Sequence, residues 1–158
     1  MSIGLTTAGI KVYYGVHTAM PTALADWTEI TEIKSIPDMN PEPSTYETTT
    51  LAQTVNKTYI DALKDMGGTL AFTCNLTDDF VDEWEALVTA YEAGQAKSTT
   101  EYTYFAFYIP GITEWFYIRG TPNALGMSGA DTDALLEIDV YIVPDEIIGY
   151  DTAPTLPV

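Results

Sequence analysis

Hydrophobic and polar residues alternate most regularly along residues 69–76. Apolar residues occupy every second position there, which is typical of a β-strand with one face in the core. The inward side chains would be Leu70, Phe72, Cys74 and Leu76. The only cysteine of the chain falls in this set, so we expect a small buried side chain and no internal disulfide.

The period changes after residue 77 to about 3.6 residues and predicts one helix over residues 78–93. Thr77 is suited to cap its first turn, where acidic residues also favour the positive end of the helix dipole. Gly94 is expected to end the helix. Its apolar face would consist of Phe80, Trp84, Leu87, Val88 and Tyr91.

Three segments in the second half of the chain have the composition of strands. Residues 101–109 are apolar or aromatic on both faces, so they are expected to be buried on both sides or to lie at an interface. Residues 114–119 could pair with them through a turn that contains Gly111. In residues 135–143 the side chains expected to point inward are Leu136, Ile138, Val140 and Ile142.

Two further strands are expected near the N-terminus. Residues 11–15 form a short aromatic strand. Residues 27–36 have an apolar side chain at every third position, which indicates a bulged strand or a strand preceded by a turn. Strands on both sides of one helix predict a mainly β fold, a two-sheet β-sandwich or barrel with that helix alongside, in a single domain of residues 1–158.

A polar segment rich in Thr and Pro covers residues 37–59. Its Thr and Tyr residues suit a two-stranded ribbon, but it has few apolar side chains for a core of its own. We expect an arm that becomes ordered against a partner, and the alternative is an ordinary surface loop. Residues 61–68 are expected to form a short helical turn ended by paired glycines. Residues 144–158 contain several prolines and are expected to form an extended C-terminal tail.

The charge of the chain argues against binding to free nucleic acid. The chain has 23 acidic and 6 basic residues, a net charge of −17. Contacts to the phosphates of free nucleic acid need clustered Lys and Arg, so we expect no such binding. No apolar run is long enough to span a bilayer, and the N-terminus does not resemble a secretory signal. We therefore expect no membrane partner and accumulation in the cytoplasm.

No residue pattern points to catalysis, to a metal or to a cofactor, and we expect no enzyme activity. His17 is the only histidine, and it lies far along the chain from Cys74. One Cys and one His are two ligands short of a structural zinc site. Asp131 and Asp133 begin like a calcium loop, but the glycine and the final carboxylate of that loop are missing. The acids at the start of the predicted helix are expected to form its solvated face.

One succession of segments resembles a known family. A strand that ends in TEIKSIP is followed by a long loop, by the Thr-rich YETTTL, and by YIDALKDMGGTLAFT, which leads into the buried strand. This succession resembles the major tail proteins, or tail tube proteins, of long-tailed, non-contractile bacteriophages (siphophages). The resemblance covers residues 9–144. Related tubes of contractile tails and of bacterial secretion systems share the fold.

The resemblance implies a structural virion protein that polymerises. Its subunits would form stacked hexameric rings, a tube through which DNA passes during ejection without specific binding. Its partners would be other copies of itself, the tail initiator or tip protein, the tail terminator protein and the tape measure protein in the lumen. It would be assembled in the host cytoplasm and located in the virion tail. Some of its acids would line the lumen, and which of them do so is left open.

Candidate assembly residues fall into two groups. The first lies on the arm and at its base: Pro37, Pro41, Pro43, Tyr46, Thr48, Thr49, Leu51, Val55, Tyr59 and Asp65. The second consists of aromatic residues of the two later strands, Tyr102, Tyr104, Trp115 and Tyr117, which could lie at an interface or at the margin of the core. The alternative function is a monomeric β-sandwich binding module, for example a carbohydrate-binding one, whose exposed aromatic side chains would stack on sugar rings.

Overall fold

A computed structural model describes residues 4–5, 8–40, 43–52, 54–64, 68–130, 132 and 134–156 of the chain. Within these residues the body consists of strands β1 (Lys11–His17), β2 (Thr28–Ile30), β3 (Ile33–Ser35), β6 (Leu70–Asn75), β7 (Tyr102–Tyr108), β8 (Trp115–Pro122) and β9 (Glu137–Asp151). They form one seven-stranded antiparallel sheet in the order β2-β1-β7-β8-β9-β6-β3.

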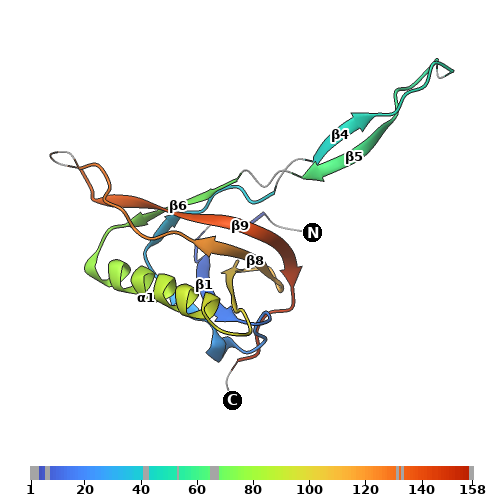
Figure 1. The fold of residues 1–158 in the computed structure, drawn as a ribbon. Helices are drawn as coiled ribbons and strands as arrows, with labels where there is room; N and C mark the ends of the chain where they lie inside the picture. The colour runs from blue at the N-terminus through green and yellow to red at the C-terminus, as the bar shows by residue number, and fades with distance from the viewer. Residues whose placement is uncertain are drawn as a thin grey trace.

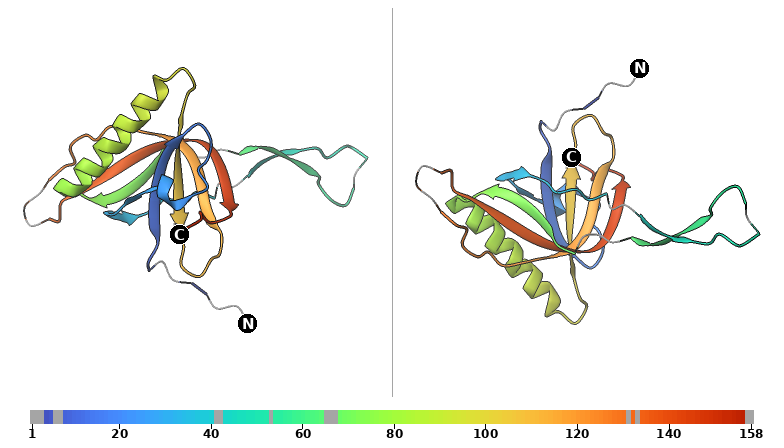
Figure 2. Two further views of the ribbon diagram at one scale, coloured as in Figure 1. Left: turned by 90° about the horizontal axis from the view of Figure 1, so that it is seen from below. Right: turned by 90° about the horizontal axis from the view of Figure 1, so that it is seen from above.

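The sheet curls into a half-barrel because its two edge strands are neighbours in the chain (Figure 2). Only Thr31 and Glu32 connect β2 at one edge to β3 at the other. The backbone N–H of Asn75 in β6 donates a hydrogen bond of 3.0 Å to the carbonyl oxygen of Glu32, which holds the crossing segment against β6. The mainly β fold with one flanking helix is confirmed. Of the two expected alternatives, a sandwich or a barrel, the body has the second in part: a single sheet curled into a half-barrel.

The single strand expected over residues 27–36 is therefore two short strands with different partners. β2 pairs with β1, whereas β3 pairs with β6. Trp27 precedes β2 and packs on one face of the sheet, while Ile30 packs on the other. The apolar residue at every third position reflects a chain that crosses from one sheet edge to the opposite edge.

Helix α1 (Asp78–Gln95) closes the concave side of the sheet (Figure 1). Phe80, Trp84 and Leu87 are buried in one core with residues from all the strands of the sheet. The predicted cap is confirmed, because the backbone N–H of Phe80 donates to the Thr77 hydroxyl oxygen at 3.1 Å. Thr77 thereby satisfies one of the N–H groups that the first helical turn leaves unpaired.

The expectation that Gly94 ends the helix is wrong. Gly94 lies inside α1 and is buried. A Cβ at this position would come within 3.0 Å of Val16 and of Glu101, so glycine allows the last turn to pack closely against β1 and the start of β7. The signal that we interpreted as a stop is a close backbone approach.

The opposite face of β1, β7 and β8 carries a second core. Its buried side chains are Trp27, Tyr104, Ala106, Trp115 and Tyr117. Two segments that are distant in sequence cover it: the short 3₁₀ helix η1 (Leu24–Asp26) and the C-terminal residues that include Ala153. The two segments are joined by backbone hydrogen bonds of 2.9 Å from Leu24 to Thr155 and from Thr155 to Thr22.

The extended tail expected from residue 144 is wrong over much of its length. β9 continues through Pro144 to Asp151 and pairs with β8 along this part. Pro144 is tolerated because it pairs opposite Gly120, at a register shift. Beyond β9 the chain docks on the body, where Pro154 is buried. Leu136, expected to point inward, precedes β9 and is exposed.

A separate two-stranded sheet, β4 (Pro43–Glu47) and β5 (Tyr59–Lys64), projects from the body as an arm (Figures 1 and 2). The expected ribbon is therefore present. The helical turn expected over residues 61–68 is wrong for residues 61–64, which belong to β5 and pair with β4. Cross-strand pairing outweighs the local turn signal there. Residues 65–67 lie outside the described part of the chain.

Candidate assembly surfaces

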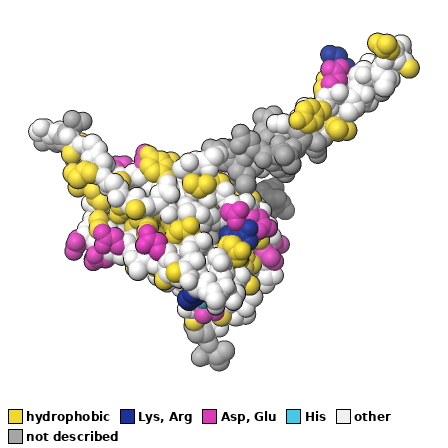
Figure 3. Space-filling view, in the orientation of Figure 1, with side chains coloured by type: hydrophobic (Ala, Val, Ile, Leu, Met, Phe, Trp, Pro, Cys, Tyr) yellow, Lys and Arg dark blue, Asp and Glu magenta, His cyan; other side chains and the backbone are white. Residues whose placement is uncertain are grey.

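The arm presents apolar side chains to solvent at several described positions on its outer part (Figure 3). Leu51 and Val55, near its far end, are almost completely exposed. Tyr46, Tyr59 and Ile60, on the two strands, each expose more than half of their surface. Ile60 was not among the expected assembly residues, because the arm was expected to end at Tyr59.

Threonine side chains hold the outer part of the arm together. The backbone N–H of Thr48 donates to the carbonyl of Thr58 at 2.7 Å, and the two hydroxyl groups are 3.0 Å apart. The backbone N–H of Thr58 donates to the Thr49 hydroxyl oxygen at 2.9 Å. These bonds extend the pairing of the two chain segments beyond Glu47 and Tyr59.

The predicted arm residues are thus brought together on one projecting element. Pro43, Tyr46, Thr48, Thr49, Leu51, Val55 and Tyr59 all lie on it. Pro37 is half-buried at the point where the chain leaves the body. Pro41 and Asp65 lie outside the described residues.

The second predicted group does not form a surface. Tyr104, Trp115 and Tyr117 are buried in the second core, so the alternative that aromatic residues belong to this chain's own core is the correct one for them. The Tyr117 hydroxyl donates to the carbonyl of Thr152 at 2.7 Å. Only Tyr102 of the four is exposed, at 38%, and the Arg119 guanidinium lies 4.5 Å from its ring centre.

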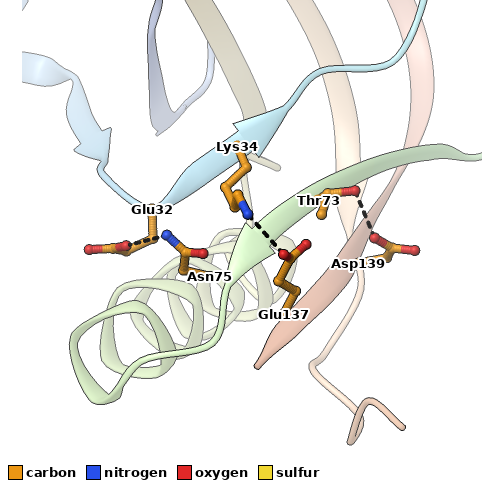
Figure 4. A network of polar contacts seen from close by, with 6 residues as sticks. All are labelled: Glu32, Lys34, Thr73, Asn75, Glu137 and Asp139. Carbon is orange, nitrogen blue, oxygen red and sulfur yellow. Dashed lines mark hydrogen bonds and ion pairs between the residues drawn. The ribbon is translucent and has the colours of Figure 1, made fainter. Parts of the chain in front are cut away.

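A paired polar network covers the face of β3, β6 and β9 that points away from the helix-side core (Figure 4). Lys34 donates to Glu137 at 2.8 Å, and the Thr73 hydroxyl donates to Asp139 at 2.9 Å. The Asn75 amide donates to Glu32 at 3.3 Å. Each acid of the network already accepts a hydrogen bond from a neighbouring side chain. This face therefore has the character of an ordinary solvent-exposed surface, and its carboxylates are not free to bind a ligand.

The structure shows the surroundings of two residues that were considered for nucleophilic or metal chemistry, Cys74 and His17. Cys74 is fully buried, and burial raises the pKa of its thiol to about 12, which keeps it protonated and unreactive. The His17 ring lies 3.2 Å from the backbone carbonyl oxygen of Asp26. Among the described residues no group of three or more His, Cys, Asp or Glu side chains could hold a metal ion. The possible calcium ligands Asp131 and Asp133 lie outside these residues.

Over the described parts of the chain, no helix has both the length and the apolar character needed to cross a membrane.

Comparison with known proteins supports the fold and leaves the family open. No protein-family model matches the sequence. No curated protein matches it either. The structure is similar to a chain in the cryo-electron microscopy structure of the anti-feeding prophage baseplate, six-fold symmetrised, with a TM-score of 0.61. The match covers 93% of this chain and 95% of that chain at 8% sequence identity. At this identity the likeness shows a common fold.

Proposed function

We propose that this chain is a structural protein of a phage-type tail, a subunit without enzyme activity that polymerises into a tail tube. In this proposal the subunits form stacked hexameric rings, and the tube carries DNA during ejection. The fold supports the proposal, because nearly the whole chain superimposes on a component of a prophage baseplate structure.

The arm is the observation that carries the proposal. β4 and β5 form a sheet of their own, and their side chains Tyr46, Tyr59 and Ile60 are exposed in the isolated chain. A lone two-stranded ribbon is marginally stable in water. An exposed apolar ribbon is expected where another subunit covers it.

The charge suits a conduit for nucleic acid. A net charge of −17 opposes contact with phosphates, so DNA in a lumen lined by such subunits would slide and not bind. The proposed partners are other copies of this chain, the tail tip and terminator proteins, and a tape measure protein in the lumen. The proposed location is the virion tail, assembled in the host cytoplasm.

The alternative, a carbohydrate-binding module, requires an exposed strip of aromatic side chains. Tyr104, Trp115 and Tyr117 cannot supply it from their buried positions.

Electron microscopy of the untagged protein, with and without a tail-tip complex as initiator, tests the proposal. Rings or hollow tubes are the expected result. A chain that remains monomeric at high concentration with the initiator present would overturn the proposal.

A shortened arm provides the matched variant. Replacing residues 48–58 by a two-residue Asn-Gly turn keeps the pairing of Glu47 with Tyr59 and removes Leu51 and Val55. We expect a folded monomer, with circular dichroism and thermal unfolding like those of the intact chain, that forms no tubes. Met127→Ser, a change at an exposed apolar residue of the body, serves as the control and should assemble normally. Normal tubes from the shortened chain would remove the arm from the assembly.

A further inference from the structure

An uncharged groove lies on the body where the arm begins. Its volume is ≈ 410 Å³, and its apolar lining includes Ile10, Ile36, Met39, Phe107, Phe116 and Tyr150. The lining therefore comes from the segment that leads into the arm, from the segment that leads into β1, and from β7, β8 and β9. A hollow of this size falls within the range of about 300–1,000 Å³ that is usual for ligand pockets.

The groove is unusual in a chain of this charge. None of the described residues that line it is charged, although the whole chain has 23 acids. One exposed acid lies at its edge: the Asp38 carboxylate accepts a hydrogen bond of 2.8 Å from the backbone N–H of Asn40, which lines the groove. The groove thus combines an apolar floor with one carboxylate at its edge.

The arm has the complementary character. Leu51 and Val55 are exposed apolar side chains near its far end, and between them the described residues are uncharged. Lys57 is exposed close to them and forms no ion pair with another described residue. An apolar end with one adjacent cation matches an apolar floor with one carboxylate at its edge.

The arm cannot serve its own groove, because it extends away from the body (Figure 1). We propose that the groove beside Met39, Phe116 and Tyr150 receives the side chains of Leu51 and Val55 from the arm of a second copy of this chain. This inference rests on the proposed function and adds the acceptor site to it. Each copy then offers one arm and one groove, a head-to-tail contact that can propagate or close into a ring.

Disulfide trapping between two singly substituted chains tests the contact. One chain carries Leu51→Cys at the arm end, and the other carries Tyr150→Cys at the groove, where Tyr150 is 58% exposed. The native Cys74 is fully buried and does not compete. The matched control replaces Tyr150→Cys by Met127→Cys, at a residue that is 83% exposed. Met127 belongs to the connection between β8 and β9, which reaches the end of the body away from the arm (Figure 1).

After the assembled mixture is mildly oxidised, we expect at least about tenfold more cross-linked dimer with Tyr150→Cys than with Met127→Cys, because a docked arm raises the local thiol concentration. Adding Leu51→Asp to the arm of otherwise unsubstituted chains should block assembly, whereas Met127→Asp, a control of equal charge at an exposed residue of the body, should not. Equal cross-linking at the two positions in well-formed rings would overturn the groove assignment and leave the proposed function standing. Absence of both rings and cross-links would overturn the two together.

Discussion

At the scale of single residues, two buried groups, the Cys74 thiol and the Tyr117 phenol, make the free energy of unfolding sensitive to alkaline pH. Burial raises the pKa of Cys74 from 9.0 to about 12, and burial, with a smaller contribution from Asp151, raises the pKa of Tyr117 from 10.0 to about 12. The folded chain therefore keeps two protons that the unfolded chain releases above these ordinary values. Their contribution to stability is complete below pH 9 and is lost as pH rises towards 12.

The variant Tyr117→Phe separates this effect from general alkaline unfolding. At neutral pH it loses the hydrogen bond to Thr152, at a cost of about 1 kcal/mol in the free energy of unfolding. Above pH 10 its stability should fall less steeply than that of the native chain. Urea unfolding between pH 7 and pH 11 gives both quantities. Tyr46→Phe, on the exposed arm, is the control, and an equal response in the two variants would contradict the assignment.

The aromatic residues show what a local pattern leaves undecided. Residues 101–109 were expected to be covered on both faces, and β7 is. The pattern could not identify the cover of the second face, because Trp27 and Ala153 come from opposite ends of the chain. Burial of Tyr104 and Tyr117 depends on this long-range packing, whereas the exposure of Leu51 follows from a polar segment that has no core.

At the scale of elements, the meeting of β8 and β9 depends on one glycine. A Cβ on Gly120 would lie 2.8 Å from the Ile142 side chain and 2.8 Å from the Val143 carbonyl oxygen. Backbone atoms cannot move away cheaply, so Gly120→Ala should lower the free energy of unfolding by about 1–3 kcal/mol. Gly126→Ala is the matched control, because nothing lies within 4 Å of its added Cβ. Denaturant unfolding of both variants measures the difference, and similar stabilities would show that the strands adjust freely.

Elements with a local signal were predictable, and those fixed by distant partners were not. α1 and β6 followed from periodicity, and the Thr77 cap followed from its residue type. β5 was missed because DALKDMGG has the composition of a turn, whereas its conformation depends on pairing with β4. β9 was expected to stop near Pro144, and it continues because Gly120 on the neighbouring strand leaves room for the proline.

The candidate site was also predictable only in part: the arm could be inferred from the sequence and the groove could not. The arm could be inferred from the long Thr- and Pro-rich segment, because such a segment cannot bury enough of its own surface. The groove could not be inferred, since Ile10, Met39, Phe116 and Tyr150 come from four separate segments. Only the curled sheet brings them together.

At the scale of the whole molecule, a neutral arm extends from a strongly acidic body. Residues 43–64 contain two acids, Glu47 and Asp61, and two bases, Lys57 and Lys64. The remaining 21 acids and 4 bases therefore account for the entire net charge of −17. Contacts made by the arm avoid the repulsion that would oppose contact between two bodies.

Ionic strength should therefore control assembly. Subunit bodies that approach one another repel over about 30 Å at 0.01 M salt, and over about 8 Å at 0.15 M. The proposed arm contact is largely apolar and is little weakened by salt. Raising NaCl from about 0.01 M to about 0.15 M should shift subunits into rings, as measured by sedimentation velocity. Assembly that weakens over this range would instead indicate that ion pairs such as those of Lys57 dominate the contact.

Neutralising acids on the exposed face of α1 separates charge from other effects of salt. Asp82→Asn with Glu85→Gln removes two negative charges from exposed positions and leaves the buried Trp84 in place. The repulsion between bodies then falls, so this variant should assemble at a lower salt concentration than the native chain. Thr89→Ser, an uncharged change at an exposed position of the same helix, should leave the salt requirement unchanged. If the neutralised and native chains need the same salt concentration, the acids of α1 lie too far from neighbouring subunits to oppose assembly, and the repulsion must arise on another face.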